Sequence, residues 1–94
     1  MNDTIMIRRS TPADRPAIAR LAELDGREAP AGSTLLGFVA GELRAAVPLA
    51  RGHALADPFH PTAELVELLR RRAGAQRDRG ARRTWRLRLA FDTR

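Results

Sequence analysis

The chain has 94 residues, fewer than the roughly 100–200 of an average domain, so it holds one small domain at most. Its composition, 44% hydrophobic and 30% charged, is too apolar for a disordered chain, and no apolar run reaches the roughly 20 residues that span a bilayer. The absence of cysteine excludes disulfides and thiolate catalysis. The N-terminus carries Asp3 where a secretory signal carries basic residues, so we expect a cytoplasmic protein with no membrane partner.

The first predicted elements are a strand and a helix. Residues 5–9 form an apolar run of strand length. Thr11 followed by Pro12 is typical of a helix start, and Gly26 favours a helix end at about residue 25. Apolar residues in this helix fall on one face. Three charged residues are predicted to lie outside that face: Arg15, Arg20 and Glu23.

A strand region follows a loop without periodicity over residues 26–33. Three apolar runs make up this region: Leu35–Ala40, Leu43–Ala50 and His53–Asp57. Connections of only two residues, Gly41-Glu42 and Arg51-Gly52, predict an antiparallel meander. Because both faces of the runs are apolar, we expect one helix on each face of the sheet. Pro48 lacks an N–H group and predicts a bulge or an unpaired stretch at its position.

A second amphipathic helix is predicted over residues 61–76, with an apolar stripe for the core. The remainder, residues 77–94, is rich in arginine, and we expect it to be a tail appended to a domain of residues 1–76. Within it, the segment Trp85–Phe91 alternates apolar residues with arginine. An alternative is therefore that this segment forms one more strand.

Charge divides the chain unequally. Residues 1–69 have a net charge of −2, whereas residues 70–94 carry ten arginines and two acidic residues, a net charge of +8. Such a block favours phosphate-bearing partners. The candidate phosphate contacts are Arg70, Arg71, Arg72, Arg82 and Arg83. The alternative is GC-rich codon usage, which the absence of lysine favours, and few aromatic residues are available to stack on bases. We therefore expect nucleic-acid binding to be weak and non-specific at most.

The segment Ile7–Leu21, IRRSTPADRPAIARL, resembles the opening of the GNAT superfamily of N-acetyltransferases. The predicted order β-α-β-β-β-α is similar to the N-terminal half of that fold. The resemblance implies an α+β GNAT-like half-domain and acetyl-coenzyme A as cofactor. In that family a glycine-rich loop binds the pyrophosphate through backbone N–H groups. Residues 57–62 stand in its place and hold no glycine and two prolines, so we predict no tight binding of acetyl-coenzyme A.

The residues themselves indicate no catalytic site, no cofactor and no metal centre. His60 precedes the second helix and is interpreted as a cap or surface residue rather than a general base. His53 and Asp57 can lie on the same side of one predicted strand and face each other, although an exposed residue at a hairpin end is the simpler interpretation of His53. Two histidines alone cannot build a zinc site. We expect no enzymatic activity, and any activity present would be N-acetyl transfer by resemblance.

Three functional hypotheses remain open. The first is a shortened GNAT-like protein without acetyl transfer, and the second is a polyanion-binding protein with an arginine-rich tail. The third is a half-domain that functions only after pairing with a second copy or another chain, because the sheet would otherwise end in unpaired edges. A homodimer through the sheet edge is the partner that this third hypothesis predicts.

Overall fold

The computed structural model describes residues 4–50 and 52–92, with side chains up to Arg77. A four-stranded antiparallel sheet and two α-helices make up the fold, which confirms the predicted α+β class. The elements in chain order are β1 (Ile5–Arg9), the 3-10 turn η1 (Pro12–Asp14), α1 (Arg15–Asp25), β2 (Thr34–Val39), β3 (Glu42–Pro48), β4 (Leu55–Ala56) and α2 (Ala63–Asp92). The strands lie in the order β1-β2-β3-β4, so the predicted meander is also confirmed.

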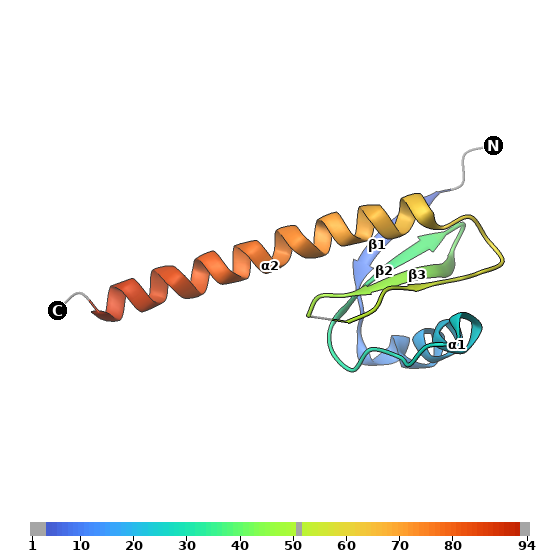
Figure 1. The fold of residues 1–94 in the computed structure, drawn as a ribbon, viewed down its shortest axis with the longest axis horizontal. Helices are drawn as coiled ribbons and strands as arrows, with labels where there is room; N and C mark the ends of the chain where they lie inside the picture. Colours follow the sequence, from blue (N-terminus) through green and yellow to red (C-terminus); the bar gives the residue numbers. More distant parts are fainter. Residues whose placement is uncertain (1–3, 51, 93–94) are drawn as a thin grey trace.

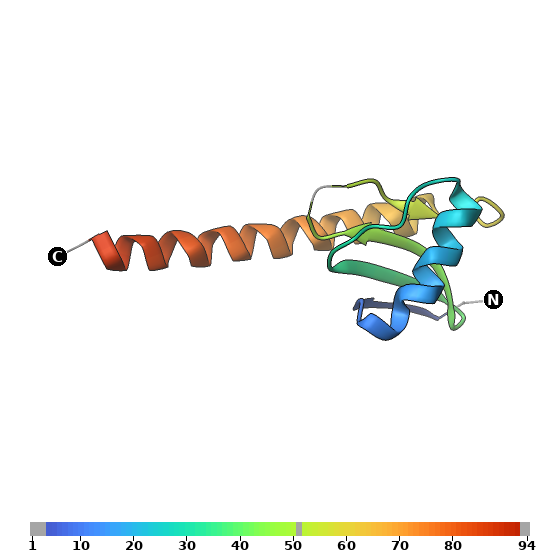
Figure 2. The ribbon, with the colours of Figure 1, turned by 90° about the horizontal axis from the view of Figure 1, so that it is seen from below.

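One helix covers each face of the sheet, as Figures 1 and 2 show, and this arrangement was predicted from the two-sided apolar strands. Alternate residues of a strand point to opposite faces, so neighbours such as Leu35 and Leu36 belong to different clusters. The cluster under α1 consists of Ile18, Leu21, Ala22, Leu36, Ala46 and Leu55. The cluster under α2 consists of Leu35, Ala45, Val47, Leu65, Leu69 and Ala73.

Two local predictions within the β2–β3 hairpin need correction. The turn residues are Ala40 and Gly41, with φ of 52° and 83°, and not Gly41-Glu42. Two consecutive positive φ angles are the pattern of a type I′ turn. The bulge lies at Arg44, where the pairing shifts from Gly37 to Phe38. A bulge at Pro48 is therefore wrong, because Pro48 pairs in register with Thr34 and is the last residue of β3. The predicted alternative of an unpaired stretch holds on the other side of β3, where only Ala45 and Ala46 pair with β4 among the described residues.

Helix α2 is much longer than predicted, since it continues to Asp92 instead of ending near Gln76. The alternative of a strand over residues 85–91 is wrong, because these residues are helical. Arginine, alanine and leucine are good helix formers, and two interior glycines at about 1 kcal/mol each do not outweigh them. The division into 1–76 and 77–94 stays a prediction.

The second half of α2 projects beyond the sheet, and the molecule is elongated, with principal extents of 57 × 29 × 21 Å (Figure 1). None of the helices in the described part of the chain combines the length and the apolar character that crossing a membrane requires.

Candidate functional site

The first candidate site is the basic surface of α2. Arg70, Arg71 and Arg72 are all exposed, while Leu69 and Ala73 on either side of them are buried. Because an α-helix has 3.6 residues per turn, three consecutive side chains are spread around its outer surface. We call these three residues the α2 arginines. Arg82 and Arg83 also lie on α2, but their side chains are outside the described part of the chain.

Contacts near the end of the sheet hold α2 in place. Leu69 is fully buried, and Arg9 at the end of β1 donates from Nη2 to Oε1 of Gln76 at 2.8 Å. Arg77 donates from Nη1 to the carbonyl oxygen of Leu49 at 3.3 Å. The α2 arginines therefore lie on an anchored helix. Arg77 adds a further cation on α2 itself, and Arg9 of β1 adds another next to the helix.

The turn after β4 contains Asp57, and its residues 57–62 were compared on sequence with a phosphate-binding loop. Asp57, which is 3% exposed, accepts hydrogen bonds from the Phe59 N–H at 2.9 Å and from Arg44 Nη1 at 2.9 Å. The Phe59 N–H, followed by Arg44, lowers the pKa of Asp57 against the opposing effect of burial. Asp57 is thus an ionised carboxylate that closes its own turn. The strand β4 has only the two residues Leu55 and Ala56 instead of the predicted run 53–57, and the turn that Asp57 closes follows it directly.

The two histidines lie on either side of β4 along the chain. His60 Nε2 lies 4.0 Å from Asp57 Oδ2, and the imidazole is about half exposed. His53 is exposed, as the simpler interpretation predicted. The alternative, His53 facing Asp57, is not among the ion pairs of the described residues, which join Asp57 to Arg44 and His60. Among residues 4–50 and 52–77, whose side chains the structure describes, no three His, Asp or Glu side chains gather closely enough to hold a metal ion.

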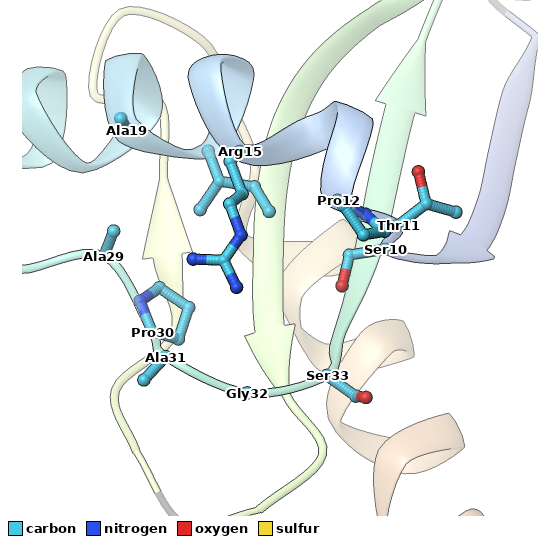
Figure 3. A pocket seen from close by; sticks show the side chains of 11 residues that line it. Ser10, Thr11, Pro12, Arg15, Ala19, Ala29, Pro30, Ala31, Gly32 and Ser33 are labelled. Carbon is cyan, nitrogen blue, oxygen red and sulfur yellow. The ribbon is translucent and has the colours of Figure 1, made fainter.

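A second candidate site is a cleft of about 420 Å³ between the start of α1 and the loop of residues 29–33 (Figure 3). We call it the α1 cleft. Arg15 extends its guanidinium into this cleft, toward the loop, as Figure 3 shows. Ser10, Thr11 and Ser33 also line the cleft, and Figure 3 shows the Ser10 hydroxyl pointing toward the loop, whereas the Thr11 and Ser33 hydroxyls point away from Arg15. The wall contains a single cation and no carboxylate.

Hydrogen bonds fix both walls of the α1 cleft. Ser10 donates its N–H to the Thr34 carbonyl at 2.7 Å, and the Ser10 Oγ accepts the Thr34 N–H at 3.1 Å. The Thr34 hydroxyl, fully buried, donates to the Gly32 carbonyl at 3.0 Å. The Leu49 N–H donates to the Ser33 carbonyl at 2.9 Å. The loop is therefore tied to the end of β1 and to the end of β3.

On the side of η1, an ion pair supports the same cleft. Arg8 binds both carboxylate oxygens of Asp14 at 2.7 and 2.8 Å, and its guanidinium lies 4.9 Å from the ring centroid of Phe38. Asp14 Oδ2 also accepts the Thr11 N–H at 2.7 Å. Arg8 is the largest cause of a strongly lowered pKa of Asp14, followed by the Thr11 N–H. Residues 11–14 are consequently held as a fixed turn.

The α1 cleft was not predicted from the sequence. Arg15 was assigned to the exposed side of its helix, which is correct, but its direction toward the 29–33 loop depends on the path of that loop. The loop has no hydrophobic period to predict its path. Arg15, a single arginine directly before Pro16, is not part of a recognisable binding motif.

Comparisons with protein-family models, with curated proteins and with solved structures find no match to this chain. The resemblance to the GNAT superfamily therefore rests on the segment 7–21 and on element order. Conclusions about function come from the geometry of the two candidate sites.

Proposed function

We propose that the protein acts by binding, and that α2 binds phosphate-bearing polyanions, with nucleic acid as the partner. The observation that carries this proposal is the exposure of the α2 arginines on an anchored helix that continues outward from the sheet. The sequence around them is strongly basic, with a net charge of +8 over residues 70–94. Neutralising phosphates with such a helix releases counterions and favours association.

The same geometry favours binding without sequence preference. Leu65, Leu69 and Ala73 are buried against the sheet, so that face of α2 is not available to a groove. Arginine contacts to phosphates fix position but do not read bases. We therefore expect affinity to depend strongly on salt and weakly on sequence.

Anisotropy of a labelled 20-base-pair duplex at about 50 mM salt tests the proposal. The variant R70Q/R71Q/R72Q should bind at least about tenfold more weakly than the wild type, because roughly three phosphate contacts are lost. The matched control R15Q/R20Q/R27Q removes the same charge from α1 and the following loop, and should retain most of the affinity.

If the two triple variants lose the same amount of affinity for the duplex, the loss reflects net charge alone, which would contradict a role for α2. A preference of a hundredfold or more between two unrelated duplexes would contradict the non-specific model. No binding at low salt would leave codon usage as the explanation of the arginines.

We further propose that the chain is a GNAT-like half-domain that does not bind acetyl-coenzyme A. The turn over residues 57–62 supports this, because the Phe59 N–H already donates to Asp57, and Pro58 and Pro61 have no N–H to offer a pyrophosphate. The Asp57 carboxylate would also repel phosphate. Calorimetry with acetyl-coenzyme A should show no binding in the micromolar range, and micromolar affinity would contradict the proposal.

A second candidate function is self-association through β1. Among the described strands, β1 pairs with β2 alone, and its adjacent residues Ile5 and Met6, which point to opposite faces, are 55% and 47% exposed. The opposite edge, β4, has only two residues. Open apolar edges of this kind favour pairing with another strand. We propose that two copies pair their β1 strands antiparallel and form a continuous sheet.

Light scattering after size exclusion tests this dimer, whose mass would be twice 10.4 kDa. The variant M6K should shift the protein toward monomer. The control L24K places a charge at another exposed apolar residue, 43% exposed on α1, and should leave the dimer intact. A wild type that is monomeric at high concentration would contradict self-association.

A further inference from the structure

The α1 cleft combines one cation, Arg15, with walls that hydrogen bonds hold in place. It lies beside α1, and α1 and α2 cover opposite faces of the sheet. No ion pair or side-chain hydrogen bond among the described residues involves Arg15, whereas Arg8, Arg27 and Arg44 all contact carboxylates. The guanidinium extends into the cleft, as Figure 3 shows. We propose that the α1 cleft binds a small monocarboxylate with an apolar body, and that Arg15 binds the carboxylate.

The chemistry of the wall fits a carboxylate head group. A guanidinium presents N–H donors in a planar fork that matches the two oxygens of a carboxylate. Ser10 uses its oxygen to accept the Thr34 N–H, which leaves its hydroxyl hydrogen for a ligand. With a single cation and no acid in the wall, the cleft balances one negative charge rather than the two of a phosphate ester.

The remaining wall fits an apolar body of modest size. Pro12, Ile18 and Pro30 line the cleft together with alanines. Its volume of about 420 Å³ lies within the range of roughly 300–1,000 Å³ that is usual for small-molecule sites. A ring with a short side chain matches this space.

The wall is also organised before a ligand arrives. The hydrogen bonds of Thr34 fix Ser10 and Gly32, and the Leu49 N–H fixes Ser33. The Arg8–Asp14 pair holds the turn on the other side. A ligand therefore orders little more than the Arg15 side chain, which limits the entropy lost on binding.

Nitrogen–proton correlation spectra of the full chain test the proposal, with 3-phenylpropionate as the probe at constant ionic strength. We expect saturable shifts of the Ser10 and Ser33 amides, with roughly millimolar affinity for a ligand of this size. The neutral analogue 3-phenylpropionamide should cause at least about fivefold weaker effects. The variant R15Q should lose the binding and keep the rest of its spectrum, while R20Q, which removes a charge from the same helix, should bind like the wild type.

Several results would overturn the proposal. Equal binding of the amide would show that charge is not recognised, and unchanged binding by R15Q would remove Arg15 from the site. Tighter binding of phenyl phosphate than of 3-phenylpropionate would assign the cleft to phosphate esters instead. Shifts confined to residues of α2 would place the anion on the basic helix and not in the α1 cleft.

Discussion

Replacing Gly37 by alanine tests how closely α2 approaches the sheet. Gly37 is buried in β2, and a Cβ atom at this position would lie 2.9 Å from Cδ1 and 3.0 Å from Cγ of Leu65. Carbon atoms in van der Waals contact lie about 3.5–4.0 Å apart. The Leu65 side chain must therefore shift, or the start of α2 must move away from β2, to accept the methyl group.

The expected effect is a lower free energy of unfolding. Overpacking of a core typically costs about 1–3 kcal/mol, and alanine recovers roughly 0.5–1 kcal/mol because glycine is disfavoured within a strand. The net loss should be about 0.5–2 kcal/mol. The control is Gly32→Ala, where a Cβ would have no atom within 4 Å. That control should be neutral or stabilising by up to about 1 kcal/mol.

Urea unfolding followed by far-UV circular dichroism measures both variants, and a double-mutant cycle with Leu65→Ala identifies the clash. Leu65→Ala alone should cost roughly 2–5 kcal/mol, and in its background Gly37→Ala should cost close to nothing. Equal stability of the Gly37→Ala and Gly32→Ala variants, or strict additivity in the cycle, would refute the close packing of α2 on β2.

Three further predictions concern stability. Leu69→Ala should lower the free energy of unfolding by about 2–5 kcal/mol, because Leu69 is fully buried between α2 and the sheet. A loss below about 1 kcal/mol in urea unfolding would contradict that burial. Truncation after Arg77 should change Tm by no more than a few degrees in a thermal melt, since the described core ends at Ala73, and a much larger drop would join residues 78–94 to the folded domain. The pKa of Asp14 is lower in the folded chain than in the unfolded one, so its contribution is complete above about pH 4 and is lost as pH falls toward the folded-state pKa. The difference in Tm between the wild type and Asp14→Asn should accordingly decrease from pH 5 to pH 2. A difference in Tm that does not change with pH would contradict this prediction.

The sheet and the position of both helices were predictable because local signals agreed with one another. Residues 5–9 are the strand β1 as predicted, and Gly26, with φ of 67°, ends α1 where the sequence indicated. The short connection between β2 and β3 indicated their pairing, whereas the predicted two-residue connection Arg51-Gly52 is wrong, because residues 49–54 separate β3 from β4. Apolar residues at neighbouring positions, such as Leu35 and Leu36, correctly predicted a layer of helix on each side.

The length of α2 and the α1 cleft were not predictable in the same way. Residues 77–84 are rich in arginine and have no apolar period, and residues 77–94 were interpreted as a tail beyond a helix over residues 61–76. Glycine at positions 74 and 80 only weakens the helix, and a Cβ at Gly74 would approach no described atom closer than Arg77 Nη2 at 4.0 Å. The bulge at Arg44 depends on tertiary contacts, since Arg44 reaches both Glu42 and Asp57 at 2.9 Å. The cleft depends on long-range hydrogen bonds of Ser10 and Thr34, which sequence periodicity does not encode.

The salt dependence of duplex binding tests the central claim most directly. For the wild type, contacts to about five phosphates predict a slope of log affinity against log salt of roughly −4 to −5. The variant R70Q/R71Q/R72Q should give a slope shallower by about 2.7, because each lost phosphate contact removes about 0.9. Identical slopes for the two proteins would show that the α2 arginines do not contact phosphates and would contradict binding of nucleic acid by α2.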